Sequence, residues 1–318
     1  MIFYKLGHIF NPFNYPELAG YVGYAQSPQA LVLPDRVRIY FSVRMRDVPD
    51  KYIAHVWFAD FKKDFSGIIQ LANRPVMCNA DLGAFDEHGI FPFSPLLSDG
   101  RLVAYTCGWS RRYSVPVETS IGFAESFDGG LSFTRLGSGP IMSNSLHEPF
   151  LVGDAFVRKW NGQFHMWYIF GIRWIKNNVS EIPERVYKIG HAISDDGINF
   201  LRNSKPIIPD VLDENECQAL PTVIYYKKQY HMIFCYRNVV GFREDKTKSY
   251  RLGYAVSDDL VTWFRRDDEL KLYPEKQEDW DSEMKCYPNL FECDGKIYLL
   301  YNGNTFGKYG FGLAALTE

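Results

Sequence analysis

One motif occurs three times in this 318-residue chain and constrains its fold more than any other feature. Each copy begins with Ile or Leu, then Gly-x-Ala-x-Ser, and the copies lie at 121–133, 189–200 and 252–263. Alternation over the first six positions predicts a β-strand, the Asp and Gly residues predict a tight turn, and an aromatic residue opens the returning strand. The motif therefore predicts a β-hairpin that the chain builds repeatedly.

Two weaker copies extend the series, at 53–55 and 311–314. The second positions of the five copies are residues 54, 122, 190, 253 and 312, so successive copies are separated by 68, 68, 63 and 59 residues. Repeats of this length are typical of solenoids and propellers.

A second hairpin precedes each copy of the motif. These hairpins are predicted at 31–41, 96–105, 156–168, 223–234 and 290–301. Each unit then has four antiparallel strands, which is the composition of a propeller blade. The sequence therefore predicts an all-β, five-bladed β-propeller that forms a single domain over residues 1–318.

The last unit contains only three predicted strands, and residues 3–7 resemble the fourth strand of the second unit at 133–137. We therefore expect the N-terminal strand to complete the last blade and close the ring. Helix content is expected to be very low, because no stretch shows a sustained period of 3.6 residues with caps.

Composition excludes several classes of protein. A net charge of −3 argues against nucleic-acid binding, and no apolar run is long enough to span a membrane. The N-terminus lacks the pattern of a signal peptide, and the six cysteines are scattered without metal-ligand spacing. We expect reduced thiols, no metal, no cofactor and a cytoplasmic location. The oligomeric state stays open.

Strand direction predicts which end of the propeller carries function. The segment before each first strand and the loop between the second and third strands share one face, and the repeated Asp-Gly turns lie on the other. Long irregular loops are where function usually resides. Candidate catalytic carboxylates on that face are Asp86, Glu148, Asp154, Glu216 and Glu283.

The same loops carry many cations, which indicates an anionic or activated sugar, because guanidinium groups match phosphate and carboxylate. The candidate substrate-binding residues are Gln26, Arg44, His88, Trp109, Arg173, Arg237, Asp281, Asn302 and Asn304. Two carboxylates in a concave site suit glycosyl transfer, one as acid and the other as base or nucleophile. Charged residues in loops are also often solvated or paired with each other, and this alternative stays open.

The chain resembles the five-bladed propeller glycoside hydrolases, the group with arabinanases, β-xylosidases, invertases and mannoside phosphorylases. The resemblance covers nearly the whole chain. It rests on the repeated motif, on residues 280–284 (Trp-Asp-Ser-Glu-Met) and on residues 301–304 (Tyr-Asn-Gly-Asn) with Phe311-Gly312. It is strongest toward a bacterial branch that the resemblance associates with surface-polysaccharide genes.

The chain departs from that group at one position. The hydrolases commonly place a catalytic Asp before the first strand of blade one, where this chain has Gln26 and Gln29. Asp86 is then a candidate base, with Glu216 or Glu148 as the acid. The resemblance implies a glycosidase-like hydrolase, a glycoside phosphorylase that binds phosphate in the arginine ring, or a non-catalytic propeller that binds sugars, sugar phosphates or nucleotide sugars in polysaccharide biosynthesis.

Overall fold

The computed structural model describes residues 1–176, 182–274 and 280–317. Strands dominate these residues, and helices account for 5%. The helical segments are single turns: η1 (Pro12–Asn14), η2 (Pro16–Leu18), η3 (Lys246–Lys248), η4 (Asp267–Glu269) and α1 (Asn304–Gly307). Among the described residues, no helix combines the length and the apolar character that crossing a membrane requires.

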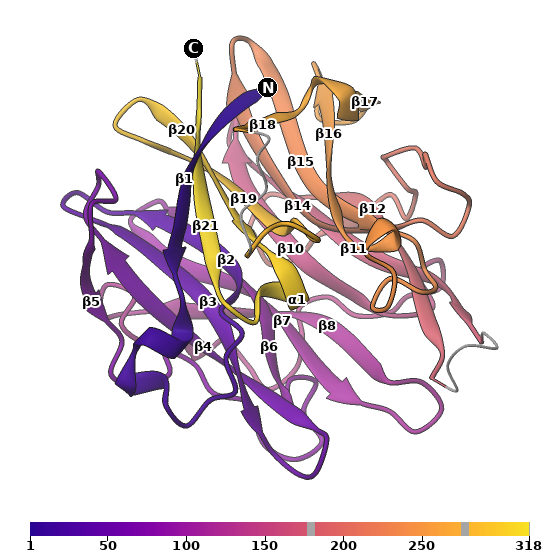
Figure 1. Cartoon of the computed structure of the whole chain (residues 1–318). Coiled ribbons are helices and arrows are strands. Elements are labelled where there is room, and N and C mark those ends of the chain that lie inside the picture. Colours follow the sequence, from indigo (N-terminus) through magenta and orange to yellow (C-terminus); the bar gives the residue numbers. More distant parts are fainter. Residues whose placement is uncertain (177–181, 275–279, 318) are drawn as a thin grey trace.

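The strands form antiparallel four-stranded units in chain order (Figure 1). The first unit contains β2 (Gln26–Val32), β3 (Val37–Arg46), β4 (Tyr52–Phe61) and β5 (Ile68–Leu71). The second contains β6 (Gly89–Ser98), β7 (Arg101–Arg111), β8 (Val117–Ser126) and β9 (Thr134–Arg135). A single parallel pair, Ala54 with Gly89, joins these two units into one sheet.

Two further units are separate sheets. One contains β10 (Val152–Trp160), β11 (Gln163–Ile175), β12 (Glu184–Ser194) and β13 (Leu201–Arg202). The other contains β14 (Cys217–Tyr226), β15 (Gln229–Arg237), β16 (Arg251–Ser257) and β17 (Phe264–Arg265).

The last sheet combines both ends of the described chain. It contains β19 (Cys286–Cys293), β20 (Lys296–Asn302) and β21 (Phe311–Leu316), and β1 (Ile2–Phe10) pairs antiparallel with β21. Figure 1 shows the indigo β1 beside the yellow β21. β18 (Lys271–Tyr273) adds to the outer side of β1 in parallel.

The first strands of the units contact one another in sequence. β2 contacts β6, β6 contacts β10, β10 contacts β14, β14 contacts β19, and β19 contacts β2. The first strands thus form a closed cycle of contacts around the centre of the molecule.

The repeated Asp-Gly motif forms the turn between the third and fourth strands. Ser126 Oγ accepts from Gly130 N at 2.8 Å, and Asp128 Oδ1 accepts from Ser132 N at 2.9 Å. The preceding unit also binds this turn, because the Tyr40 hydroxyl donates to the Gly130 carbonyl at 2.8 Å. The motif therefore stabilises its own turn and the contact between neighbouring units.

Every first strand contains a β-bulge at the equivalent position. The register shifts lie between residues 26 and 29, 90 and 93, 153 and 156, 219 and 222, and 286 and 289. Ser27, Asp154, Leu220 and Tyr287 adopt positive φ there, between 47° and 56°. Left-handed backbone is uncommon outside glycine, and bulges redirect side chains. These positions are therefore candidates for residues that face the centre.

Candidate functional site

Four predicted site carboxylates form a repeated ion pair with the fourth strand of their own unit. The pairs are Asp86–Arg135 (2.6 Å), Glu148–Arg202 (2.7 Å), Glu216–Arg265 (2.5 Å) and Asp281–Lys5 (2.7 Å). All four acidic side chains are fully buried. Buried charges persist when they are paired and hydrogen-bonded, so the repeat fastens the segment before each first strand to the fourth strand of its unit.

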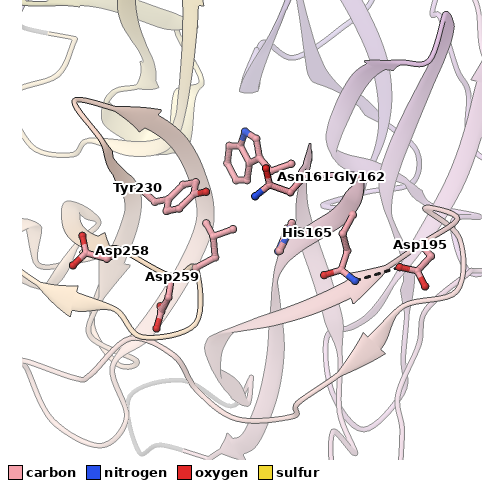
Figure 2. Close-up of a pocket in the computed structure, with 10 residues that line it drawn as sticks. Asn161, Gly162, His165, Asp195, Tyr230, Asp258 and Asp259 are labelled. Carbon is pink, nitrogen blue, oxygen red and sulfur yellow. Dashed lines mark hydrogen bonds between the residues drawn. The ribbon is translucent and has the colours of Figure 1, made fainter.

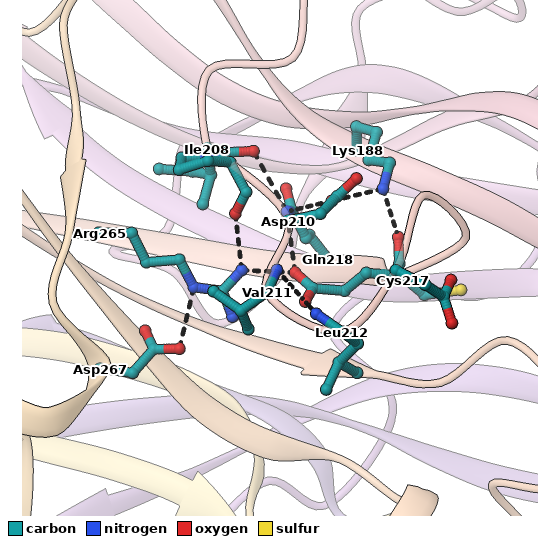
Figure 3. Close-up of polar contacts among 12 residues, drawn as sticks. Lys188, Ile208, Asp210, Val211, Leu212, Cys217, Gln218, Arg265 and Asp267 are labelled. Atoms are coloured by element: carbon teal, nitrogen blue, oxygen red, sulfur yellow. Dashed lines mark hydrogen bonds and ion pairs between the residues drawn. The ribbon is translucent and has the colours of Figure 1, made fainter.

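Glu216 accepts hydrogen bonds from several groups, and Figure 3 labels four of the residues that supply them: Val211, Leu212, Gln218 and Arg265. Its Oε2 accepts from the backbone N–H groups of Val211 and Leu212 at 3.0 and 3.1 Å. Its Oε1 accepts from Gln218 Nε2 at 3.0 Å in addition to Arg265. With its oxygens occupied in this way, Glu216 fits a structural role.

Glu148 is similarly constrained, since Tyr168 donates its hydroxyl to Oε1 at 2.5 Å and Arg202 donates to Oε2. Asp86, Glu148 and Glu216 are thus each buried and ion-paired. Each stays within its own unit, and the catalytic role of each stays a prediction that this geometry does not favour.

Three predicted binding residues make structural contacts. Asn302 donates from Nδ2 to two backbone carbonyls at 2.7 Å, and its Oδ1 accepts from Ser27 N, so it joins the last unit to the first. Asn304 Oδ1 accepts from two backbone N–H groups at 2.8 and 3.0 Å. Arg237 is buried, with Phe242 at 3.5 Å and two tyrosine rings beyond it.

Other predicted residues lie at the periphery. Glu283 is about half exposed and lies 3.6 Å from Lys246, and Arg173 lies 3.2 Å from Glu214. His88 stacks on Trp109 with ring centroids 5.6 Å apart, and burial lowers the pKa of its imidazole. His88 thereby supports one wall of the cavity described next.

A cavity of about 860 Å³ lies where the first strands begin and the loops between second and third strands converge. Its walls include aromatic side chains from three units: Tyr52, Phe91, Trp109 and Tyr287. Phe91 and Tyr287 occupy the first-strand bulges of their units. Of the predicted site residues, Gln26, Arg44 and Trp109 line this cavity.

The charge of the cavity is strongly positive. The cations that line it are Arg44, Lys51, Arg111, Arg112, Lys176 and Arg185, and the acid is Asp50. Two of the cations are neutralised, since Arg111 pairs with Asp47 at 2.7 Å and Arg112 pairs with Glu118.

Two arginines of the cavity differ from these. Within the described parts of the chain, neither Arg44 nor Arg185 has a carboxylate partner. Arg44 Nε donates to Gln26 Oε1 at 2.9 Å, and its guanidinium lies 4.4 Å from the Tyr24 ring. Burial lowers the pKa of Arg44, the tyrosines around it act in the other direction, and the charge of Arg185 makes a smaller lowering contribution. Two unpaired cations that line the same cavity indicate a site for an anion.

Asp154 differs from the other predicted carboxylates. It occupies the first-strand bulge of its unit, is 7% exposed, and no ion pair holds it among the described residues. Burial raises the pKa of its carboxyl to about 7, although Leu220 N–H and the charge of Arg185 act in the other direction. Such a carboxyl can hold a proton near neutral pH and release it.

Asp154 does not itself line the cavity, but two neighbours connect it to the lining. Gly153, its chain neighbour, packs against Thr119, which lines the cavity, and Arg185 links the cavity to Asp154 electrostatically. The cavity and Asp154 together form the candidate site.

Sequence reasoning missed Arg185, Phe91 and Tyr287. The bulges had a signal, because a proline follows the bulge residue at Ser27-Pro28, Phe91-Pro92, Leu220-Pro221 and Tyr287-Pro288. Arg185 lies at the start of a third strand, outside the loops that were searched for cations. Among the described residues, no group of three or more His, Cys, Asp or Glu side chains is placed to hold a metal ion.

Comparison with known proteins adds relatives along the whole chain. No family model matches it. An uncharacterised protein of Mycobacterium tuberculosis (strain ATCC 25618 / H37Rv) is 30% identical over 324 residues, covering 99% of each chain. The β-1,2-mannobiose phosphorylase of Thermoanaerobacter sp. (strain X514) is 31% identical over 139 residues, covering 41% of this chain and 44% of the phosphorylase.

Solved structures show the same fold at low identity. One described as a glycoside hydrolase has a TM-score of 0.70 at 14% identity and covers 94% of this chain and 92% of its own. A thermostable family-43 glycoside hydrolase has a TM-score of 0.61 at 14% identity, covering 91% and 87%. A structure from the GH130 family of mannoside phosphorylases, described as containing hydrolases that target β-1,2-mannosidic linkages in Candida mannan, has 0.65 at 12%, covering 93% and 84%.

Proposed function

The chain belongs to the family of the Mycobacterium tuberculosis protein and has the fold of glycoside hydrolase-like propellers, and from this premise we propose that it is a glycoside phosphorylase. Its substrates would be an oligosaccharide and inorganic phosphate, both bound in the cation-rich cavity. The observation that carries the proposal is the pair of unpaired arginines, Arg44 and Arg185, near a carboxyl with a raised pKa.

The finer architecture that we propose is a five-bladed propeller. The closed cycle of contacts among β2, β6, β10, β14 and β19 supports it, as does the pairing of β1 with β21. In this arrangement each four-stranded unit is one blade, and the cavity lies over the central channel.

Phosphorolysis fits the polar groups of the site. The reaction needs one acid to protonate the leaving oxygen, while a phosphate oxygen attacks the anomeric carbon in place of water. The C–O bond to the leaving sugar breaks, the proton of Asp154 goes to that oxygen, and a sugar phosphate forms. General acid catalysis requires a pKa near the working pH, which burial gives Asp154.

Arg44 and Arg185 would hold the phosphate. A doubly charged anion between two guanidinium groups forms charge-assisted hydrogen bonds, and the partial burial of Arg44 strengthens them. The aromatic walls, Trp109 above all, would stack on sugar rings, whose C–H faces are apolar. The partial match to β-1,2-mannobiose phosphorylase is consistent with this chemistry.

The repeated ion pairs favour a second candidate, a non-catalytic sugar-binding propeller. They keep four of the predicted site carboxylates from the cavity and leave Asp154 as the candidate acid. The two functions differ in one measurement, since only a phosphorylase converts phosphate into a sugar phosphate.

The test has two arms. The first measures phosphate binding without a sugar by ³¹P NMR or thermal shift, where Arg44→Gln and Arg185→Gln are expected to weaken binding. Arg46→Gln is the matched control, because Arg46 is an exposed residue two positions along the same strand. Equal affinities in all three variants would refute the phosphate site.

The second arm incubates the protein with phosphate and β-1,2-mannobiose, xylobiose or arabinobiose. We expect a sugar phosphate from at least one donor, and none in the Asp154→Asn variant. Phosphate and sugar binding without product would establish the binding function instead.

We also propose a cytoplasmic location and a role in polysaccharide metabolism. All six cysteines are free thiols, and five of them are buried, which suits a reducing compartment. Oxidative formation of native disulfides in the purified protein would contradict the location.

A further inference from the structure

A second cavity, of about 570 Å³, lies on the opposite side of the units, at the junction of the third and fourth (Figure 2). It is lined by the β10–β11 turn and by the repeated turn motifs that contain Asp195 and Asp259. Figure 2 shows Tyr230, Asp258 and Asp259 on one side and Asn161, Gly162 and His165 on the other. It shares no lining residue with the cation-rich cavity.

Trp160 gives this cavity a rigid aromatic wall. Its ring lies 5.2 Å from that of Tyr230 and 5.6 Å from that of the fully buried Trp167, between centroids. Trp160 itself is only partly buried and lines the cavity. Because its neighbours hold the ring, stacking a ligand on it costs little side-chain entropy.

The polar groups of the rim are acids and amides. Asp258 Oδ1 accepts from Gln229 at 2.8 Å, and Asp195 Oδ1 accepts from Gln163 at 3.2 Å. Asn161 contributes an exposed amide at the turn. No lysine or arginine lines the cavity within the described parts of the chain, so this site lacks the groups that bind anions.

We propose that this cavity is a second saccharide site, which binds an uncharged oligosaccharide. Carboxylate and amide oxygens accept hydrogen bonds from sugar hydroxyls, and Asp258 and Asp195 are already oriented by a glutamine each. The indole and phenol rings supply the apolar faces on which sugar rings stack. The cation-rich cavity would bind an anion, whereas the carboxylates of the second cavity would repel one. The two cavities would therefore bind different classes of ligand.

The site would hold a glycan chain on the protein without taking part in chemistry. A polymer that engages both cavities gains effective concentration at the first from binding at the second. The inference does not depend on phosphorolysis, because the second site binds whether or not the first is catalytic.

The experiment follows the indole Nε1–H resonances by NMR while β-1,2-mannotriose, xylotriose and maltotriose are added to the full chain. We expect at least one to shift the Trp160 resonance, and trigalacturonate to leave it unchanged. Spermidine, a polyamine, tests whether this acidic and aromatic cavity binds an organic cation instead of a sugar. A Trp160 shift with spermidine and with no sugar would overturn the proposal, as would no shift with any probe at about 10 mM, which corresponds to negligible affinity.

Variants confirm the location. Trp160→Ala and Asp258→Ala are each expected to weaken binding about tenfold, the scale of one stacking or charge-assisted contact, and calorimetry measures the affinity because Trp160→Ala removes the indole resonance. Asp258 is exposed, so its variant is expected to fold, and Asp268→Ala is the matched control on another exposed acid. Arg44→Gln should leave this affinity unchanged. Loss of binding in Arg44→Gln with retention in Asp258→Ala would assign the sugar to the first cavity and refute the second site.

Discussion

The buried ion pairs and the cation-rich cavity use the same kinds of residue for opposite purposes. Glu216 and Arg265 form an ion pair inside one unit, and the arrangement recurs three more times with other residues. Arg44 and Arg185 line the cavity, Asp154 lies in a first-strand bulge, and no ion pair neutralises the three in the described chain. What repeats in this molecule is structural, and what breaks the repeat carries the capacity to bind and react.

The largest expected effect concerns the acid that has no ion-pair partner in the described chain. Asp154→Asn should reduce phosphorolysis by about 10² to 10⁴-fold, the usual contribution of a general acid. Glu216→Gln should retain the activity of whatever fraction folds. Steady-state assays normalised to folded protein check this, and a greater loss in Glu216→Gln would reverse the comparison.

Asp154 also has a signature in stability. Its pKa lies above the unfolded value, so the folded state binds the proton more tightly and the free energy of unfolding falls as pH rises from about 4 to about 7. Asp154→Asn should remove that fall. Urea unfolding at several pH values measures the slope, and an unchanged slope in the variant would show that Asp154 titrates normally.

The structural role of the buried ion pairs is tested by comparing the free energies of unfolding of Glu216→Gln and Glu283→Gln. Removing one partner of a buried ion pair lowers the free energy of unfolding by about 3 to 5 kcal/mol. We expect about 3 kcal/mol for Glu216→Gln, because Arg265 still pairs with Asp267 at 2.9 Å in the variant. Glu283 is about half exposed and should cost less than about 1 kcal/mol. Similar losses in the two variants would remove the distinction between structural and peripheral carboxylates.

The cavity arginines should show a smaller effect. Arg44→Gln or Arg185→Gln is expected to raise the KM for phosphate about tenfold, which corresponds to the loss of one charge-assisted contact. The free energy of unfolding should stay constant or rise, since each substitution removes an uncompensated charge. A lower free energy of unfolding in either variant would show that the arginine stabilises the fold, as the buried ion pairs do.

A small effect is also expected in the turn motif. Asp259 Oδ1 accepts from the backbone N–H groups of Val261 and Thr262, and these bonds lower the pKa of its carboxyl to about 2. Asp259→Ala should cost about 1 kcal/mol at neutral pH. Since the carboxyl is exposed, the difference in free energy of unfolding between the wild type and the variant should be small. It should disappear as pH falls from about 4 toward 2. Urea unfolding of both proteins at neutral and acidic pH measures it.

The sequence was informative where the structure is periodic. The Ser-x-Asp turn at 126–128 and its copies could be placed because their hydrogen bonds are local. The pairing of residues 3–7 with β21 followed from a likeness between two short strands. Low helix content followed from the absence of a 3.6-residue period.

The partners of charged residues could not be predicted in the same way. Asp86 and Arg135 lie 49 positions apart and meet only when the unit folds, so the sequence showed a loop acid where the structure has a buried pair. Arg185 was not predicted, because it lies in a strand and the sequence does not show that it lacks an ion-pair partner. Whether it has a carboxylate partner depends on the neighbouring units, which no local pattern reports.

The pairing of β1 with β21 has a consequence for how the protein is made. Phe3 of β1 pairs with Leu316 of β21, so β1 leaves the ribosome long before its partner strand is synthesised. Synthesis at about 5 to 20 residues per second separates the two by at least about 15 seconds. During that interval the earlier units can form while β1 stays unpaired, so β1 docks onto β21 only after those units have been synthesised.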